Sequence, residues 1–344
     1  MKKLNIKMGI ILALLLSFFG MSLINVSAET YNQLSIKAII PENQIDKNRS
    51  YFDLMMAPNQ KQDIQLSITN NGEESMVAEI SLNDASTGNN GVIIYTEEGK
   101  KDQSLKLAAT QIVKIANDKV EIEPKKNVLV NLSINMPENK FGGNVLSGII
   151  VKGKKLNPEK TEEKEKSITI NNEIVYVVGL NLRMDKDSVK PHLNLISVKD
   201  ALVNYRTGVV ANIQNDQAVI MKGVKINGEI KKKGSDDVVS KVDLKSADIA
   251  PNTNFDVVYD WNGKAIKKGK YQIRMTAEYE GEKWVWDEEF EIKDPSEVNT
   301  GAYFMESTNN HWLLITLSII GAILIFLLIL VLKRRKKDDM KEGY

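Results

Sequence analysis

The fold class is decided by Ile64-Gln65-Leu66-Ser67-Ile68-Thr69-Asn70-Asn71-Gly72, a stretch in which apolar and polar side chains alternate until a turn begins. A period of two places one row of side chains on a buried face of a β-sheet and the other row on a solvated face. Asn70-Asn71-Gly72 has the composition of a turn. Alternating apolar residues from Met76 to Leu82 predict the answering strand.

The same alternation recurs along the chain. Val128 to Ile134 is half-buried in the same way, and the strand-like segment from Ile168 to Leu182 is expected to pair back with Val145 to Val151 as a long hairpin. A second series follows Pro191, with strands expected at 209–213, 219–226, 255–259, 271–277 and 284–292. Short alternating strands between Asn, Gly, Asp and Pro turns are typical of antiparallel sandwiches. We therefore predict an all-β chain with two immunoglobulin-like β-sandwich domains.

The N-terminus has the features of a secretory signal peptide. Lys2, Lys3 and Lys7 precede an apolar run, and Val26-Ser27-Ala28 fits the small-x-small pattern that signal peptidase reads. We expect cleavage after Ala28, and the alternative is an uncleaved membrane anchor.

The C-terminus has the features of a membrane anchor. Trp312 to Leu332 contains no charged residue, and its 21 residues would span about 31 Å as a helix, the thickness of a bilayer core. The basic run that begins with Lys333, Arg334 and Arg335 follows at once, and positive residues stay on the cytoplasmic side. Trp312 lies where an interfacial anchor belongs. We expect a single-pass type I protein of the cell membrane, with its exterior domains in the cell wall.

A Lys- and Glu-rich stretch, 152–166, lies between the two series of strands and is interpreted as a solvated linker, with a binding arm as the alternative. The boundary between the two domains therefore falls within a range of about twenty residues. The predicted segments are the signal peptide (1–28), a first β-sandwich domain (29–160), a second (161–297), a juxtamembrane linker (298–311), the transmembrane helix (312–332) and a cytoplasmic tail (333–344).

Composition and motifs give little support to catalysis. The chain has no cysteine, a net charge of +1 and only two histidines, His192 and His311. Nucleophilic triads and the common zinc and nucleotide motifs are therefore not indicated. Acidic pairs such as Glu97-Glu98 and Asp236-Asp237 lie in turn-like polar stretches. We expect no enzyme activity, no cofactor, no metal and no nucleic-acid partner.

Aromatic residues supply the candidate ligand-binding positions. Trp284 and Trp286 share one face of a strand with Phe290 and Ile292. This face is either core, opposite 271–275, or an exposed stacking surface for sugar or protein. Trp261 ends another strand and is open to the same two interpretations.

Several stretches resemble the WxL-interacting protein family, surface proteins of low-GC Gram-positive bacteria. In the first domain they are Tyr51-Phe52-Asp53-Leu54, Pro137-Glu138-Asn139-x-Phe141-Gly142-Gly143 and Gly148-Ile149-Ile150, and in the second Ile249-Ala250-Pro251-Asn252-Thr253-Asn254-Phe255, Gly269-Lys270-Tyr271 and Trp284-Val285-Trp286. The resemblance runs from about Tyr31 to Arg335 and includes the anchor.

The resemblance implies that the first domain binds peptidoglycan and that the protein associates with secreted proteins bearing Trp-x-Leu motifs. It also names host extracellular matrix proteins as candidate partners of the second domain, in adhesion. Phe141 joins Trp261, Trp284 and Trp286 as a candidate ligand-binding residue. The competing hypotheses are a transmembrane envelope sensor, whose tail of 333–344 carries no domain, and a wall-active hydrolase, which would need a buried acidic pair in a cleft.

Overall fold

The computed structural model describes residues 33–96, 101–156, 174–186, 189–303, 316 and 318–321. These residues form an all-β protein with several antiparallel sheets, as the alternation predicted. The signal peptide lies outside the described residues, as does most of the predicted span 312–332. Within the part of the chain that the structure describes, no helix is long and apolar enough to cross a membrane.

The described residues of the first half form eleven strands and a short helix: β1 (Leu34–Ile39), β2 (Phe52–Met55), β3 (Lys61–Asn70), β4 (Met76–Asp84), β5 (Ser86–Thr87), β6 (Ile93–Ile94), α2 (Ala109–Ile112), β7 (Val113–Ile115), β8 (Lys119–Ile122), β9 (Asn127–Asn135), β10 (Val145–Lys155) and β11 (Val175–Arg183). The second half contains β12 (Leu193–Val203), β13 (Arg206–Asn215), β14 (Met221–Lys232), β15 (Val238–Ile249), β16 (Thr253–Asp260), β17 (Gly269–Tyr279), β18 (Glu282–Ile292) and the helix α3 (Ser296–Thr300).

Contacts divide the chain into two units that do not follow chain order. Unit 1 contains the described residues up to Asn194, together with Gln214–Val224 and Ser246–Phe255, which are turns and strand ends of the second half. Unit 2 contains Leu195–Ile213, Lys225–Lys245 and the described residues from Asp256 onward.

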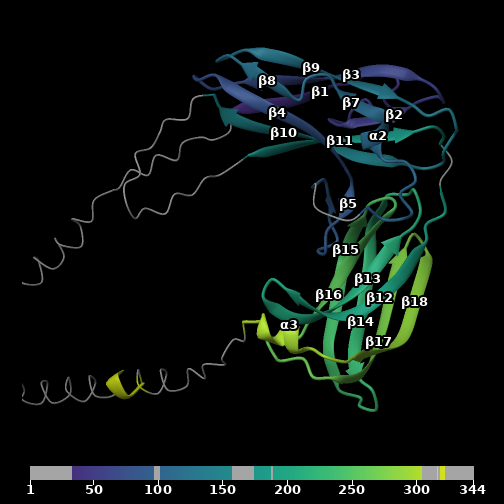
Figure 1. The fold of residues 1–344 in the computed structure, drawn as a ribbon, viewed down its shortest axis with the longest axis vertical. Coiled ribbons are helices and arrows are strands. Elements are labelled where there is room, and N and C mark those ends of the chain that lie inside the picture. The colour runs from purple at the N-terminus through teal and green to yellow at the C-terminus, as the bar shows by residue number, and fades with distance from the viewer. Residues whose placement is uncertain are drawn as a thin grey trace, which may run out of the picture. The chain divides into compact units, whose positions relative to one another are not determined.

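Two sheets form the body of unit 1 (Figure 1). One has the strand order β1-β3-β9-β7 and the other β2-β11-β10-β4-β8. Leu66 and Leu132 of the first sheet and Ile149 and Leu180 of the second belong to a single hydrophobic core. The alternation predicted for 64–68 is confirmed, since the apolar side chains of this segment are buried in that core.

The expected pairing of β3 with β4 is wrong. β3 pairs with β1 and β9, whereas β4 pairs with β10 and β8 in the other sheet. The Asn70 side chain is fully buried, and its Nδ2 donates to the carbonyls of Glu74 and Ile122 (2.7 and 3.0 Å). These bonds hold a connection that carries the chain from one sheet to the other, so both strands keep an apolar face toward the same core.

The expected hairpin between β10 and β11 is confirmed for the described residues. The two strands pair antiparallel from Val145 opposite Leu182 to Lys152 opposite Val175. β2 then adds to the other side of β11 in parallel. This three-strand arrangement positions the candidate site.

The second half contains two further sheets, with orders β12-β13-β16 and β15-β14-β17-β18 (Figure 1). All five strands predicted after Pro191 are present. β12 and β15 were not predicted, because neither alternates regularly along its whole length. Apolar residues are adjacent in β12, as at Leu195-Ile196, and the polar Ser240 takes a buried position in β15. The buried residues of unit 2 include Val209, Ile226 and Ile273.

Candidate functional site

The outer face of the β2-β11-β10 strands gathers polar and aromatic side chains in unit 1. Leu180 and Leu182 of β11 point into the core, so their neighbours Gly179, Asn181 and Arg183 point to the opposite face. The same alternation holds for β2, where Phe52 and Leu54 are core residues and Asp53 faces away. The face therefore combines residues from strands far apart in the sequence.

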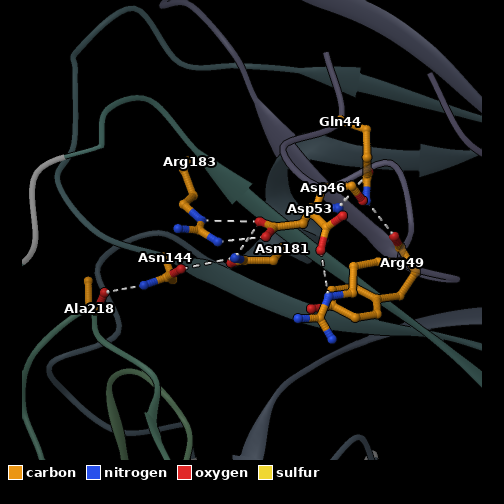
Figure 2. Close-up of polar contacts among 9 residues, drawn as sticks. Gln44, Asp46, Arg49, Asp53, Asn144, Asn181, Arg183 and Ala218 are labelled. Atoms are coloured by element: carbon orange, nitrogen blue, oxygen red, sulfur yellow. Dashed lines mark hydrogen bonds and ion pairs between the residues drawn. The ribbon is translucent and has the colours of Figure 1, made fainter. Parts of the chain in front are cut away.

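An ion pair closes one end of this face (Figure 2). Arg183 Nη2 lies 2.6 Å from Asp53 Oδ2, and Arg183 Nε lies 3.1 Å from Asp53 Oδ1. Two parallel hydrogen bonds of this kind fix both side chains more firmly than a single contact does. Asp53 is buried, so the guanidinium supplies charge neutralisation that water cannot.

Asn181 lies at the centre of the network, between Asp53 and Asn144. Its Nδ2 donates to Asp53 Oδ1 and to Asn144 Oδ1, both at 2.9 Å (Figure 2). Both partners are acceptors, so the orientation of the Asn181 amide is fixed. Its Oδ1 is buried and has no hydrogen-bond partner among the described residues, and the side chain is only 2% exposed. An acceptor left without a donor in this way marks a place where a donor would be stabilising.

The network continues within unit 1 to the turn that contains Ala218. The backbone N–H and Nδ2 of Asn144 both donate to the Ala218 carbonyl, at 2.7 and 3.2 Å. Gly143, one of the resemblance glycines, has a φ of +81°, and a Cβ on it would lie 2.1 Å from the same carbonyl oxygen. Only glycine satisfies both constraints.

Two tyrosines lie against a pair of glycines beside this network. Gly148 of β10 and Gly179 of β11 are directly opposite one another. A Cβ on Gly148 would lie 2.5 Å from Tyr95 Cγ, so the Tyr95 ring rests on bare backbone. A Cβ on Gly179 would lie 3.7 Å from Tyr51 Cβ, which is ordinary contact. We name Tyr51, Tyr95, Gly148 and Gly179 the tyrosine–glycine face.

Hydrogen bonds hold the backbone of both tyrosines. Gln44 Nε2 donates to the Tyr51 carbonyl, and Gln44 Oε1 accepts from the Asp53 N–H, both at 2.9 Å. Asn83 Nδ2 donates to the Tyr95 carbonyl at 3.0 Å. Both rings are half-buried. Burial raises the pKa of the Tyr95 hydroxyl, and the charge of ionised Tyr51 raises this pKa further, so the two hydroxyls are electrostatic neighbours.

The predicted tryptophan face is present in the sheet of β17 and β18. The register places Trp284 opposite Ala277 and Trp286 opposite Met275, which confirms that these side chains share a face with the buried positions of β17. Both tryptophans are half-buried, so their exposure lies between that of a core residue and that of an exposed stacking surface. β18 is the last strand of its sheet, which leaves these rings without a further strand beside them among the described residues.

The other two predicted binding residues pack against neighbouring side chains. Trp261 is only 5% exposed, and its ring meets Tyr271 at 5.7 Å and 72°. Tyr271 in turn stacks on Phe290 at 5.7 Å and 25°. Phe141 is partly buried and packs against the core of unit 1.

Sequence reasoning did not single out the tyrosine–glycine face or the Asp53–Asn181 network. Tyr51, Asp53 and Gly148 lie in stretches quoted for the family resemblance, but no role was assigned to them. A signal was present in Gly148, because glycine inside a β-branched strand often marks the close approach of another group. Gly179, inside Val175–Arg183, carries the same signal.

Groups that could support catalysis or hold a metal are sparse in the described ranges. No group of three or more His, Cys, Asp or Glu side chains that could hold a metal occurs there. His192 is exposed, and its Nδ1 lies 3.0 Å from Asp216 Oδ1. Burial raises the pKa of Asp216, but hydrogen bonds from Gln217, His192 and Asn194 outweigh it and leave the pKa below its usual value. Glu97-Glu98 lies outside the described residues, and Asp236 and Asp237 are exposed.

Comparison with solved structures gives only remote likenesses. The E. coli chaperone DraB is 14% identical, with 76% of this chain and 98% of that chain covered at a TM-score of 0.29. The Pseudomonas aeruginosa CupB2 chaperone is 10% identical, with coverage of 68% and 95% and a TM-score of 0.28. The ASH/PapD-like domain of human CEP192 is 9% identical, with coverage of 46% and 88% and a TM-score of 0.27.

Family models give a more specific answer. No curated protein matches the sequence. The model described as the WxL Interacting Protein peptidoglycan binding domain matches residues 34–153, and the one described as the host binding domain matches residues 165–300. The two descriptions support a non-enzymatic role at the cell surface in peptidoglycan binding and adhesion. The matches are in tandem and together cover well over half of the 344 residues, so the chain belongs to the WxL-interacting protein family.

Proposed function

We propose that this protein is a membrane-anchored scaffold at the cell surface, which binds peptidoglycan with its first domain and captures secreted proteins bearing Trp-x-Leu motifs. The single observation that carries the proposal is the tandem match of a peptidoglycan-binding and a host-binding domain model at 34–153 and 165–300. In this proposal the functional segments are 29–160 and 161–297, each an immunoglobulin-like sandwich.

The ends of the sequence support the membrane part of the proposal. A signal peptide cleaved after Ala28 would export the chain, and the uncharged stretch 312–332 followed by Lys333 to Lys337 would stop transfer with the tail inside. The exterior domains would then lie in the cell wall. Such a tether keeps the binding domains close to the polymer that they hold.

The tryptophans of unit 2 are the proposed protein-contact residues. Trp284 and Trp286 leave part of each ring exposed on the last strand of a sheet, and partly exposed aromatic side chains are frequent anchors of protein interfaces. A secreted Trp-x-Leu protein or a host matrix protein is the proposed partner of this surface. Trp261 contributes by supporting its domain rather than by direct contact, because it is almost fully buried against Tyr271. The half-buried Phe141 remains a proposed contact residue of the first domain.

Cosedimentation tests the scaffold proposal. The full-length protein in detergent is mixed with insoluble peptidoglycan, with insoluble cellulose as the control polymer. We expect the protein to sediment with peptidoglycan only and to release no soluble muropeptides. Sedimentation with neither polymer would contradict the binding role, and release of muropeptides would favour the wall-active hydrolase instead.

Protease accessibility tests the topology. We expect protease added to intact wall-stripped cells to remove the exterior and to leave a membrane fragment of roughly thirty residues, the size of an anchor and a short tail. Protection of the two β-domains, 29–160 and 161–297, from the protease would contradict the proposed orientation.

A further inference from the structure

We propose that the tyrosine–glycine face of unit 1 binds the uncharged sugar rings of an N-acetylated glycan, so that the glycan strand rather than the peptide is what this protein recognises in peptidoglycan. The inference rests on the proposed peptidoglycan binding and assigns it to particular residues. The features that carry it are the bare backbone of Gly148 and Gly179 and the Asn181 oxygen that has no partner among the described residues.

The glycine pair lets an aromatic ring lie directly on the sheet. No side chain separates Tyr95 from β10, since a Cβ on Gly148 would occupy the position of the ring. The near side of the ring therefore packs on the strand, and its half-buried state leaves the remainder open to solvent. Tyr51 stands over the neighbouring strand at Gly179 and is also half-buried, with part of its side chain against the core of unit 1. Two adjacent rings held in this way form a platform.

The chemistry of such a platform matches a pyranose. A pyranose ring presents C–H groups on its faces and hydroxyl groups around its rim, so it stacks on an aromatic ring while its rim remains hydrogen-bonded. Tyrosine has the complementary character, an apolar ring with a polar tip. Small-ligand sites commonly combine aromatic walls with a few fixed polar groups.

The fixed polar group is Asn181. Asn181 follows Gly179 by two residues on the same face of β11, a spacing of about 6.6 Å. Its Oδ1 accepts no hydrogen bond from the described residues, although the side chain is buried and its orientation is set by Asp53 and Asn144. An N-acetyl N–H or a hydroxyl of a sugar stacked on the platform is a donor of the kind that this oxygen lacks.

The charge of the face favours the glycan over the peptide. Arg49 is paired with Asp46, and Arg183 donates to both carboxylate oxygens of Asp53 (Figure 2). Each pair is neutral as a whole, so neither offers a free cation to a carboxylate of a stem peptide. A neutral sugar can lie beside the Asp53–Arg183 pair without an electrostatic cost, because the sugar leaves that ion pair intact.

The test uses the full-length protein in detergent with two soluble probes, tri-N-acetylchitotriose as peptide-free glycan and a free stem pentapeptide. The variants are Tyr51→Ala and Tyr95→Ala. Tyr303→Ala is the matched control, since Tyr303 is an exposed tyrosine of unit 2. We expect each face variant to weaken chitotriose binding about tenfold or more, as loss of an aromatic contact residue commonly does, and the control to bind as the parent does.

Insoluble peptidoglycan separates the failure of this inference from the failure of the proposed function. If the parent and both face variants sediment equally, the protein binds the wall and the tyrosine–glycine face is not the site. If the parent itself does not sediment, the proposed function fails and this inference fails with it. Binding of the stem peptide but not of chitotriose would overturn the choice of ligand.

A milder substitution guards against loss of folding. Tyr95→Phe keeps the ring on Gly148 and removes only the hydroxyl, so it should retain more chitotriose binding than Tyr95→Ala. Thermal melts of both variants show whether the fold is intact. Equal loss of binding in Tyr95→Phe and Tyr95→Ala, with parental melting temperatures, would contradict stacking as the source of affinity.

Discussion

A tyrosine lies against a strand glycine in each unit, and the two contacts have opposite surroundings. In unit 1 a Cβ on Gly148 would lie 2.5 Å from Tyr95 Cγ, and in unit 2 a Cβ on Gly228 would lie 2.1 Å from the Tyr259 hydroxyl oxygen. Tyr95 is half-buried on an outer face, whereas Tyr259 is completely buried. Burial raises the pKa of Tyr259 strongly. The same pair of residue types therefore makes a surface platform in one unit and a core contact in the other.

The difference shows that burial, not residue type, decides what a glycine–tyrosine pair does. The Tyr259 hydroxyl is buried without a partner among the described residues, which is a cost to stability. Tyr95 avoids that cost because part of it is open to water. Substitutions in the Gly228–Tyr259 pair should therefore lower stability more than substitutions in the Gly148–Tyr95 pair. Only substitutions in the Gly148–Tyr95 pair should weaken glycan binding.

The largest effect is expected from Trp261→Ala in unit 2. This side chain is 5% exposed and packs edge-on against Tyr271, so its removal leaves a cavity and should lower the free energy of unfolding by about 3–5 kcal/mol. Urea unfolding of the full-length protein measures the loss. Trp286→Ala is the matched control, and we expect about 1–2 kcal/mol there, because that ring is already partly in water. Equal losses would remove the distinction between core and half-buried tryptophan.

A smaller loss is expected from Gly228→Ala. The new methyl group would lie 2.1 Å from the Tyr259 hydroxyl and 3.1 Å from the Arg274 carbonyl oxygen, and the buried tyrosine has little room to move. Overpacking of this kind should cost about 2–3 kcal/mol. Tyr259→Phe removes the clashing oxygen, so the double variant should recover most of the loss. Additive effects of the two substitutions would show that the contact is not the cause.

The corresponding change in unit 1 is Gly148→Ala, and its effect on stability should be smaller. The half-buried Tyr95 can swing away from the strand, and alanine lowers the conformational entropy of the unfolded chain, so we expect a loss of about 1 kcal/mol. Gly179→Ala is the matched control, because its Cβ meets Tyr51 only at an ordinary 3.7 Å. A loss for Gly148→Ala as large as that for Gly228→Ala would mean that Tyr95 is locked in place.

The sequence predicted the strands better than their partners. The alternation at 64–68 and 128–134 identified β3 and β9, because a half-buried strand must alternate. It could not show that β3 and β4 join opposite sheets, since an apolar face is needed in either arrangement. β12 and β15 were missed because exposed apolar residues such as Ile196 in β12, and the buried polar Ser240 in β15, break the period of two.

The candidate site was less predictable than the fold. The tyrosine–glycine face and its network combine residues near 51, 95, 148 and 181, which come together only through long-range pairing of β2, β10 and β11. The tryptophan face could be predicted, because its side chains lie on one strand and their common face follows from period two alone. Local periodicity therefore finds sites within one strand and not sites between strands.

The smallest effect, and the one with the opposite sign, is expected from Tyr259→Phe. Its hydroxyl has no partner among the described residues, so its removal should raise the free energy of unfolding by about 0.5–1 kcal/mol, after a small void beside Gly228 is allowed for. Tyr271→Phe is the matched control in the same unit, because the Tyr271 hydroxyl donates to the Lys267 carbonyl at 2.7 Å. Loss of that bond should lower stability by about 1 kcal/mol. Urea unfolding of both variants gives the two signs directly, and a loss in Tyr259→Phe equal to that in Tyr271→Phe would show that the buried hydroxyl has a partner, such as a bound water molecule.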